Sequence, residues 1–446
     1  MVPAVPEQPN ILLVTTDQQH FRLMSCAGDP YVHTPALDEL AASGTRFGLA
    51  YSANPVCVPC RYSMMTGHMP HVFDGLETNR KRPDAERPKM RDWIDSPAMG
   101  HLLRGAGYET AYGGKLHVEG PYSYTPVEED TYGFRWICSD IREQLAEECA
   151  AYLRGSHDRP FFIWASFDNP HDICGFLRAE SPARECDAEP VPLPENFAPT
   201  RHEAGWIRAL REGSLGSEET LELGLNRRFA LTARDWPEDT WRCYRGVYRM
   251  FMEQVDRQVG LIMDALRDSG HDRDTVVVFL SDHGEHDGAH GLTMKRTFYE
   301  ESVHVPMVIV PPGGTAGGID NEHLVSNGLD LLPTICDYAG IGKPPALPGR
   351  SLRPLVERRS PRWRDYVVSE TVGGRMVRTE RFKYMVLHCE GCSEEQLFDM
   401  KEDPLETTNL AGSAETGDVL RRHRETLARW VKAQGDAKGR LYLSTL

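Results

Sequence analysis

Polar side chains follow four apolar segments of the chain, at the points where these segments end. They are Asp17 and Gln18 after residues 11–16, Lys115 and His117 after a short strand from Tyr108, Asp168 and His171 after residues 161–166, and Asp282 and His283 after residues 275–280. Such groups could bind a cation, stabilise an anion and transfer protons. Each residue alone is better explained as a turn or packing residue, whereas the whole set at strand ends favours one functional site.

Asp17, Asp282 and His283 form a candidate site for one divalent cation. Carboxylate and amide oxygens suit Ca²⁺, which we favour, and the imidazole of His283 leaves Mn²⁺ open.

The cysteine pair in Cys57-Val-Pro-Cys60-Arg61 is a second candidate for chemistry. A redox-active CxxC motif would use a helix N-terminus to lower the pKa of one thiol. The chain is far longer than a thioredoxin-like unit, however, and no strand leads directly into the pair. Two buried structural thiols near the start of a helix are another explanation, and a third considers the whole pentapeptide.

The pentapeptide resembles the Cys-x-Pro-x-Arg maturation motif of the formylglycine-dependent (type I) sulfatases, which belong to the alkaline phosphatase superfamily. Further segments resemble blocks of that family in the same order and at similar spacings. They are residues 10–17, 31–38, 62–68, 114–117, 170–171, 281–284, 291–295, 299–302, 396–404 and 408–410. On these blocks the chain is identified as a member of the sulfatase family.

The resemblance implies how the nucleophile and the metal are held. In the family the motif cysteine is oxidised to formylglycine, whose hydrate is the nucleophile, so Cys57 is the expected site of this modification. One divalent cation would be held by Asp17, Gln18, Asp282 and His283, together with an oxygen of the modified Cys57.

The resemblance also implies roles for the charged residues around the nucleophile. Arg61 would hold the hydrate, and Lys115 and Lys295 would neutralise charge on the sulfuryl oxygens. His171, with Lys295, would protonate the leaving alkoxide. His117 would take the proton whose loss expels sulfate and restores the aldehyde.

The expected activity is hydrolysis of a small-molecule or saccharide sulfate ester, with a formylglycine-generating maturation enzyme as a partner. Gln18 stands where many members carry a second aspartate, and its combination with His283 is also seen in phosphonate monoester and phosphodiester hydrolases of the superfamily. Such a hydrolase is one alternative, and an N-sulfate (sulfamate) hydrolase is another. A non-catalytic, metal-binding relative that keeps Cys57 as a thiol is a third. It would have no reason to retain Lys115, His117, His171 and Lys295.

Two further residues are expected to contact the substrate. Asn79 follows the block around the pentapeptide, and His290 lies in the loop after His283, where a solvated loop position explains it equally well. Residues 176–237 are polar and have no clear period. This stretch is too long for an ordinary connection and indicates an insertion or lid.

Short apolar strands and amphipathic helices alternate along the chain, and these elements hold the candidate site residues in place. Strands are expected at residues 11–16, 161–166, 275–281 and 305–310, and helices at 34–42, 96–104, 140–154, 239–269 and 328–339. This alternation predicts an α/β fold with a large, mainly parallel sheet sandwiched by helices, alkaline-phosphatase-like. Residues 1–345 would form the catalytic domain. Residues 346–446 would form a C-terminal subdomain with a small antiparallel sheet and a terminal helix at 415–434.

The amino-acid composition limits the classes of partner that the chain is expected to bind. The chain has 446 residues, 40% of them hydrophobic, and a formal net charge of −16, so it can bury a sizeable core but lacks the basic character of a nucleic-acid binder. The acidic balance also mildly disfavours a long polyanionic substrate. No apolar run approaches the roughly 20 residues of a membrane-spanning helix. Residues 1–9 do not resemble a signal peptide, so a cytoplasmic location is expected. The 11 cysteines, Cys243 among them, are expected to be mostly small buried residues and not a disulfide framework.

Overall fold

A central eight-stranded sheet organises the chain. The computed structural model describes residues 8–72, 97–118, 132–178, 186, 188–214, 233–345, 347–389 and 391–446. The strand order is β5-β4-β6-β1-β7-β8-β2-β9. The strands are β1 Asn10–Asp17, β2 Thr45–Phe47, β4 Glu109–Gly114, β5 Arg135–Cys138, β6 Phe161–Pro170, β7 Thr275–Ser281, β8 Met307–Val310 and β9 Gly318–Asp320. Only β8 runs antiparallel to its neighbours, so the prediction of a mainly parallel sheet is confirmed.

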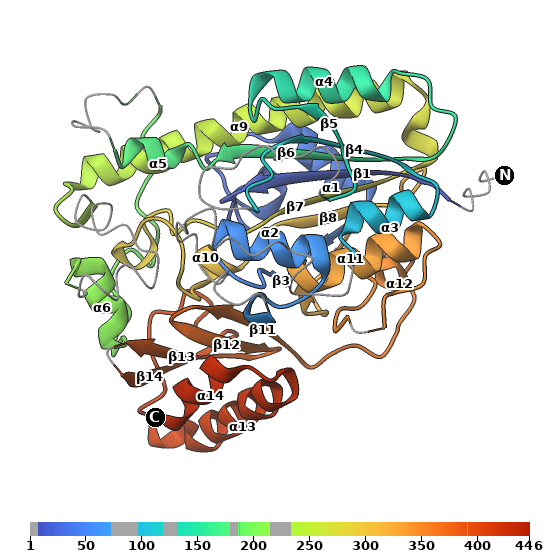
Figure 1. The fold of residues 1–446 in the computed structure, drawn as a ribbon. Helices are drawn as coiled ribbons and strands as arrows, with labels where there is room; N and C mark the ends of the chain where they lie inside the picture. Colours follow the sequence, from blue (N-terminus) through green and yellow to red (C-terminus); the bar gives the residue numbers. More distant parts are fainter. Residues whose placement is uncertain are drawn as a thin grey trace, which may run out of the picture.

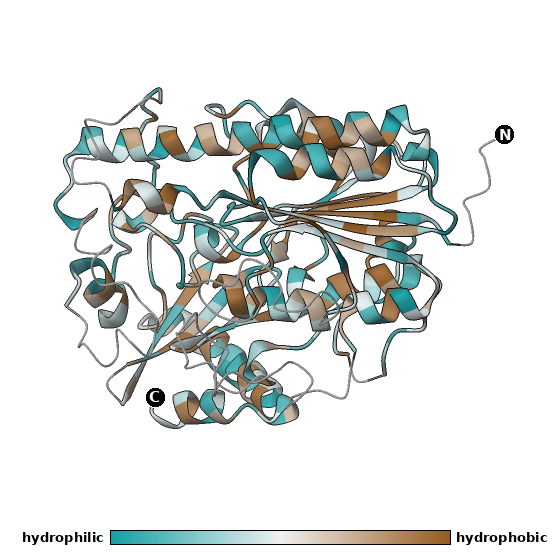
Figure 2. Cartoon of the chain, turned by 45° about the horizontal axis from the view of Figure 1, so that its top comes forward, coloured by the Kyte–Doolittle hydropathy of each residue, from teal (hydrophilic) through white to brown (hydrophobic). Residues whose placement is uncertain are grey.

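The central strands are apolar along their length because both faces of the sheet are covered. Every residue of β1, β6 and β7 is buried. Ile11 pairs with Phe162 on one side and with Val276 on the other, which fixes the register of these three strands. The ribbon of the central strands is coloured largely as hydrophobic in Figure 2.

Helices pack on both faces of this sheet (Figure 1). One face carries α1 Pro35–Ser43, α4 Glu143–Leu153 and α9 Glu238–Asp268, and the other carries α2 Cys57–Thr66, α3 Met99–Gly105, α11 Asn327–Tyr338 and α12 Arg353–Val356. Shorter helices are α5 Ile173–Phe176, α6 Gly205–Glu212 and α10 Glu300–Val303, and β3 Ala50–Tyr51 pairs with β10 Val325–Ser326. The predicted α/β fold is thus confirmed, with most boundaries displaced by only a few residues.

Helix α2, which carries the cysteine motif, is enclosed on all sides. All ten of its residues are buried. Helix α11 approaches it closely at Gly328, where a Cβ atom would lie 2.7 Å from the Cβ atoms of both Ala53 and Ser63. A side chain at position 328 would therefore push α11 away from α2.

The C-terminal region forms a four-stranded antiparallel sheet covered by two helices. Its strands are β11 Tyr366–Thr371, β12 Gly374–Thr379, β13 Phe382–Cys389 and β14 Cys392–Asp399, and its helices are α13 Gly417–Gln434 and α14 Ala437–Ser444. The small sheet and α13 confirm the prediction, whereas α14 was not expected. The predicted boundary after residue 345 and the predicted lid at 176–237, part of which lies outside the described residues, stay predictions.

An ion-pair cluster joins this region to the segment after α2. We call His71, Glu370, Arg375 and Asp436 the junction cluster. Arg375 binds Asp436 through Nε at 2.6 Å and Nη2 at 2.9 Å, and its Nε lies 3.7 Å from Glu370. Glu370 in turn contacts His71 Nδ1 at 2.8 Å. The guanidinium thus lies between two carboxylates.

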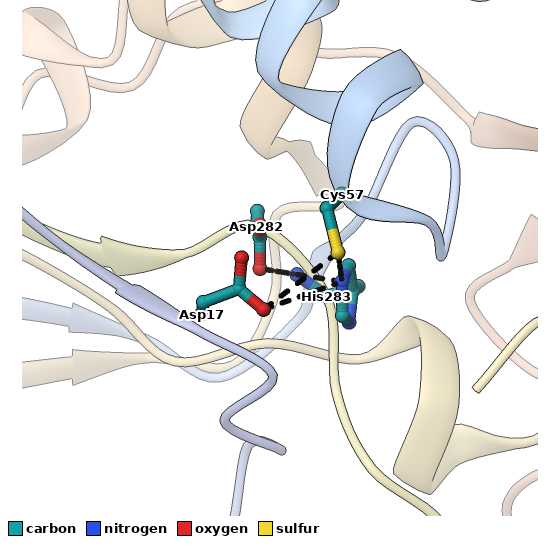
Figure 3. Close-up of side chains that lie close together, drawn as sticks. All are labelled: Asp17, Cys57, Asp282 and His283. Atoms are coloured by element: carbon teal, nitrogen blue, oxygen red, sulfur yellow. Dashed lines mark hydrogen bonds and ion pairs between the residues drawn. The ribbon is translucent and has the colours of Figure 1, made fainter. Parts of the chain in front are cut away.

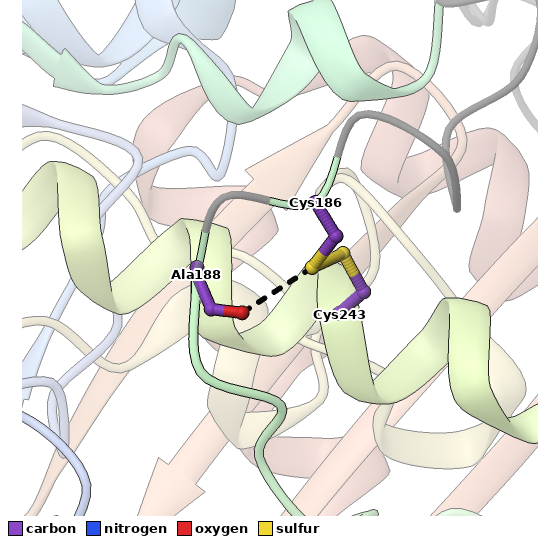
Figure 4. The surroundings of a disulfide bond; sticks show 3 residues. All are labelled: Cys186, Ala188 and Cys243. Carbon is purple, nitrogen blue, oxygen red and sulfur yellow. Dashed lines mark hydrogen bonds between the residues drawn. A yellow bond between two sulfur atoms is a disulfide. The ribbon is translucent and has the colours of Figure 1, made fainter.

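A disulfide fastens the segment before residue 190 to α9 (Figure 4). Cys186 and Cys243 are bonded across a sequence separation of 57 residues. The expectation that Cys243 is an unpaired buried thiol was therefore wrong. Its partner comes from a segment that only the folded chain brings to the helix. The other nine cysteines, all within the described part of the chain, are not disulfide-bonded.

Among the described residues, no helix combines the length and the apolar character that crossing a bilayer requires.

Candidate active site

Four adjacent parallel strands end at the same edge of the sheet. In the order β4-β6-β1-β7, their carboxyl ends carry Lys115 and His117, Asp168 and His171, Asp17 and Gln18, and Asp282 and His283. Ligands of open α/β sheets bind at such an edge. The structure brings together all the strand-end residues that the sequence singled out, and α2 and Lys295 complete the group.

Asp17, Cys57, Asp282 and His283 converge on one buried point (Figure 3). The Cys57 Sγ lies 3.1 Å from His283 Nε2 and 3.7 Å from Asp17 Oδ1. His283 Nε2 lies 3.9 Å from Asp17 Oδ1 and 3.6 Å from Asp282 Oδ1. One ligand atom from each residue thus lies within 4.8 Å of the others.

Arg61 binds the Oδ2 atoms of both carboxylates. It follows Cys57 by one helical turn of α2, and its Nη2 and Nε contact Asp17 Oδ2 at 3.0 Å and Asp282 Oδ2 at 2.9 Å. Since the guanidinium takes the Oδ2 atom of each carboxylate, the two Oδ1 atoms are directed toward Cys57 and His283. Burial lowers the pKa of Arg61, but the two carboxylates outweigh this and hold it above its usual value.

The donor set fits a divalent cation. Burial, and then the neighbouring Asp17, raises the pKa of Asp282 to about 6, as expected for two carboxylates held close together. The residues at this point are fully buried, and carboxylate oxygens with one imidazole nitrogen are ligands that hard or borderline cations accept. A cation would relieve the repulsion between the two carboxylates.

Cys57 is the first residue of α2, so its thiol lies at the helix N-terminus, where the helix dipole favours negative charge. Lys295 Nζ lies 3.2 Å from its sulfur. Burial opposes ionisation, but Lys295 and His283, with hydrogen bonds from His117 and His171, hold the pKa of Cys57 well below its usual value. The position is therefore built to stabilise an anion.

Lys115 lies between two carboxylates at the ends of neighbouring strands. Its Nζ contacts Asp17 Oδ2 at 2.8 Å and Asp168 Oδ1 at 2.7 Å. Burial lowers the pKa of Lys115, yet Asp168 and Asp17 together raise it well above its usual value, so the group stays cationic. By contrast, burial lowers the pKa of His117, which leaves a neutral imidazole able to accept a proton.

His171 follows Asp168 at the end of β6. Its Nδ1 lies 3.8 Å from Asp168 Oδ1, and its Nε2 lies 3.9 Å from Cys174 Sγ. Burial lowers the pKa of His171, but negative groups around it, Cys174 first and then Asp17, together outweigh this and raise the pKa well above its usual value. His171 thus differs from His117 in carrying a proton.

Two site residues adopt left-handed backbone conformations, with φ of 71° at Gln18 and 47° at His117. Residues with side chains adopt this region at a cost, which surrounding structure must offset, and such positions concentrate at functional sites. Gln18 directly follows β1 and His117 lies three residues after the end of β4, and both strands are fixed by pairing on both sides.

Sequence reasoning missed several residues that contact this group. Glu285 accepts a hydrogen bond from Gln18, Cys174 lies beside His171, and Tyr248 of α9 donates to the Gln18 backbone oxygen at 2.5 Å. Proximity in the sequence to His283 and His171 was an available signal for Glu285 and Cys174. Nothing local marks Tyr248.

The two predicted substrate contacts have different outcomes. Asn79 lies outside the described residues. His290 is fully buried, stacks on Tyr299 with ring centroids 3.9 Å apart, and hydrogen-bonds to Thr200 and Asn196. Its ring has no free surface for a substrate, so this geometry makes His290 a packing residue and corrects the prediction.

Comparison with known proteins gives consistent matches over nearly the whole chain. The sulfatase family profile matches residues 9–341, and a profile described as N-sulphoglucosamine sulphohydrolase, C-terminal, matches residues 288–433. The Delta 4,5-hexuronate-2-O-sulfatase of Bacteroides thetaiotaomicron is 31% identical, over 96% of this chain and 90% of its own. The choline-sulfatase of Rhizobium meliloti is 30% identical, over 91% of this chain and 82% of its own.

Solved structures of related proteins have a similar fold. A structure described as a 2-O GAG sulfatase superposes with a TM-score of 0.81 at 28% identity, covering 96% of this chain and 93% of that one. The phosphonate monoester hydrolase of Agrobacterium radiobacter shares the fold, with a TM-score of 0.75 at 23% identity and 96% coverage of both chains.

The mainly parallel sheet, together with the family profile over residues 9–341, places the chain in the sulfatase class of hydrolases. The chain belongs to the sulfatase family and is a sulfuric ester hydrolase, which confirms the prediction.

Proposed function

We propose that this sulfatase hydrolyses a sulfate ester on a sugar ring, with residue 57 as a formylglycine nucleophile beside one divalent cation, Ca²⁺ in preference to Mn²⁺. The observation that carries the proposal is the position of Cys57. Its sulfur lies among two carboxylates, an imidazole and a lysine, at a helix N-terminus.

Asp17, Gln18, Asp282 and His283, with an oxygen of the modified residue 57, would hold the cation. When present, the cation lowers the pKa of a bound hydroxyl and polarises sulfate oxygens, and the oxidised residue supplies a hydroxyl that can attack sulfur. The site residues then have to bind the sulfate group, donate a proton and accept another.

The cationic side chains bind and orient the sulfate. Lys295 Nζ is 3.2 Å from Cys57 Sγ, which occupies the place of the attacking oxygen, and Lys115 approaches the same point from the β4 side. Both are buried, so their charges act in a medium that screens weakly. Arg61, locked on Asp17 and Asp282, holds the carboxylates that surround residue 57.

Two histidines with opposite protonation move the protons. His171 carries a proton that it can give to the departing sugar oxygen. His117 is neutral and can take a proton from the remaining hydroxyl at residue 57, so that sulfate leaves and the aldehyde returns. The two side chains interact with Cys57 from the ends of neighbouring strands β4 and β6.

The relatives support a saccharide as the substrate. One is named for a 2-O-sulfated, unsaturated hexuronate, and one solved structure is described in complex with D-glucosamine-2-N, 6-O-disulfate. A net charge of −16 favours a small sulfated sugar over a long polyanion. The segment 176–237 and the C-terminal subdomain would supply the contacts that select the sugar.

Mass spectrometry of the tryptic peptide 47–61 tests the nucleophile, in protein coexpressed with a formylglycine-generating enzyme. We expect residue 57 to have lost one sulfur and two hydrogens and gained one oxygen. An unmodified Cys57, or one bonded to Cys60, would contradict the mechanism.

A substrate screen tests the reaction. Matured protein should cleave 2-O- or 6-O-sulfated mono- and disaccharides faster than sulfamates, aryl sulfates or choline sulfate. Preference for a phosphonate monoester or a phosphodiester would favour the alternative hydrolase. Binding of a cation without turnover of any ester would favour a non-catalytic relative.

A further inference from the structure

We infer that Glu285 is a positioning residue that fixes the side-chain amide of Gln18 so that its oxygen faces the cation. This inference rests on the proposed cation site and deepens it. Glu285 comes two residues after His283, in the turn that follows β7. Its side chain is fully buried.

The amide of Gln18 lies between a carboxylate and an ammonium group. Its Nε2 donates to Glu285 Oε2 at 2.5 Å, and its Oε1 accepts from Lys295 Nζ at 2.5 Å. Lys295 Nζ also contacts Cys57 Sγ at 3.2 Å, so the oxygen end of the amide is the end that faces the reacting residue.

These two partners determine the orientation of the amide. An ionised carboxylate can only accept hydrogen bonds and an ammonium group can only donate them. Rotating the amide by half a turn would place its oxygen against Glu285 and its NH₂ against Lys295, which loses both hydrogen bonds. The amide oxygen is therefore presented to the cation without a negative charge at position 18.

Glu285 is itself held rigidly as an acceptor. Its Oε1 receives hydrogen bonds from the Tyr244 hydroxyl at 2.7 Å and from the Met294 backbone N–H at 2.5 Å. The turn that carries it is packed against α10, where a Cβ atom on Gly284 would lie 1.9 Å from the Glu301 backbone oxygen. Every polar neighbour thus donates to Glu285, and the carboxylate cannot rotate away from Gln18.

The pair explains why glutamine suits position 18 in this chain. A carboxylate at position 18 would lie at hydrogen-bond distance from Glu285, and two carboxylates this close in a buried site cannot both be ionised without strong repulsion. Gln18 and Glu285 therefore depend on each other. The negative charge that an aspartate would place at position 18 is carried instead by Glu285, which contacts the Gln18 side chain.

Calcium binding to variants of the matured full-length protein tests this role. In Glu285→Gln, the amide of Gln18 can adopt either orientation. We expect calcium chloride to bind roughly 10- to 100-fold more weakly by calorimetry, the range found when outer partners of metal ligands are removed. Excess calcium should restore kcat, with KM for the ester unchanged.

Two further variants separate positioning from folding. Gln18→Glu should lower the melting temperature of the calcium-free protein, and adding Glu285→Gln should restore much of it. Asp287→Asn is the matched control. Asp287 is a buried carboxylate on the same loop, paired with Arg249 at 3.1 Å, so its loss should lower the melting temperature while calcium affinity is kept.

Wild-type calcium affinity in Glu285→Gln would overturn the positioning role and leave the proposed function intact. A wild-type protein that binds neither calcium nor manganese would instead overturn the cation site, and this inference with it.

Discussion

Among the described residues, three clusters combine histidine with carboxylates, and two of them could be mistaken for each other. Asp17, Cys57, Asp282 and His283 form the first, and the junction cluster forms the second. In the junction cluster, Arg375 lies between Glu370 and Asp436 and supplies the positive charge itself. In the first cluster, Arg61 binds the outer oxygens only, so the inner oxygens still face one another.

The difference shows that buried charge alone does not identify a functional site. The useful criterion is where the compensating cation sits. When a side chain of the protein occupies the centre of the cluster, the charges serve stability and an ion has no place. When the cationic side chain binds only the outer carboxylate oxygens, the inner oxygens remain able to bind a metal ion, and the site can stabilise an anionic transition state.

Replacing the nucleophile should give the largest effect. Cys57→Ala should lower kcat for the best sulfate ester at least about 10³-fold, because no hydroxyl remains to attack sulfur. The free energy of unfolding should change by only about 1 kcal/mol. Cys60→Ser on the same helix is the matched control, since a serine can still donate to the Asp282 backbone oxygen that Cys60 contacts at 2.9 Å. An equal loss of kcat in both variants would contradict the assignment of residue 57 as the nucleophile.

Opening the junction cluster should destabilise the protein without changing its chemistry. Asp436→Asn leaves Arg375 buried with incomplete compensation, and we expect a loss of about 3 kcal/mol in unfolding free energy, measured by urea titration. The activity of the folded fraction should remain. A loss of calcium affinity in this variant would show that the two clusters are coupled.

Removing the cation should have a somewhat smaller effect, confined to the first cluster. At a free calcium concentration 100 times Kd, bound calcium contributes about 2.7 kcal/mol, so a chelator should lower the melting temperature of the wild type. Asp17→Asn should be insensitive to the chelator, whereas Asp436→Asn should respond like the wild type. A response of Asp17→Asn equal to that of the wild type would place the cation elsewhere.

The smallest effect concerns pH and the junction cluster. Burial lowers the pKa of His71, but Glu370 outweighs it and the net pKa is raised. A raised folded-state pKa means that the stabilisation is complete below about pH 6.5, the unfolded value, and is lost as pH rises through the folded value. The unfolding free energy of the wild type should therefore fall more steeply than that of His71→Asn above pH 6.5. Parallel curves would show that the ion pair contributes nothing.

Much of the site could be predicted because its residues end strands that the sequence marks clearly. Asp17 and Asp282 follow continuous apolar segments, and parallel strands place their carboxyl ends at one edge whatever the detailed packing. The residues that were missed or misjudged depend on packing between distant segments. The Cys186–Cys243 bond joins residues 57 positions apart, and His290 lies near His283 in sequence while its ring turns away to stack on Tyr299.

The complete burial of α2 has a consequence for the order of events in biosynthesis. An enzyme that oxidises residue 57 must take the surrounding peptide into its own active site, and no atom of Cys57 is exposed in the folded chain. Core elements of this kind open only in rare, nearly global unfolding. If residue 57 is oxidised as proposed, the oxidation has to precede folding. The fraction of active molecules is then set during synthesis, and a folded preparation keeps that fraction for its lifetime.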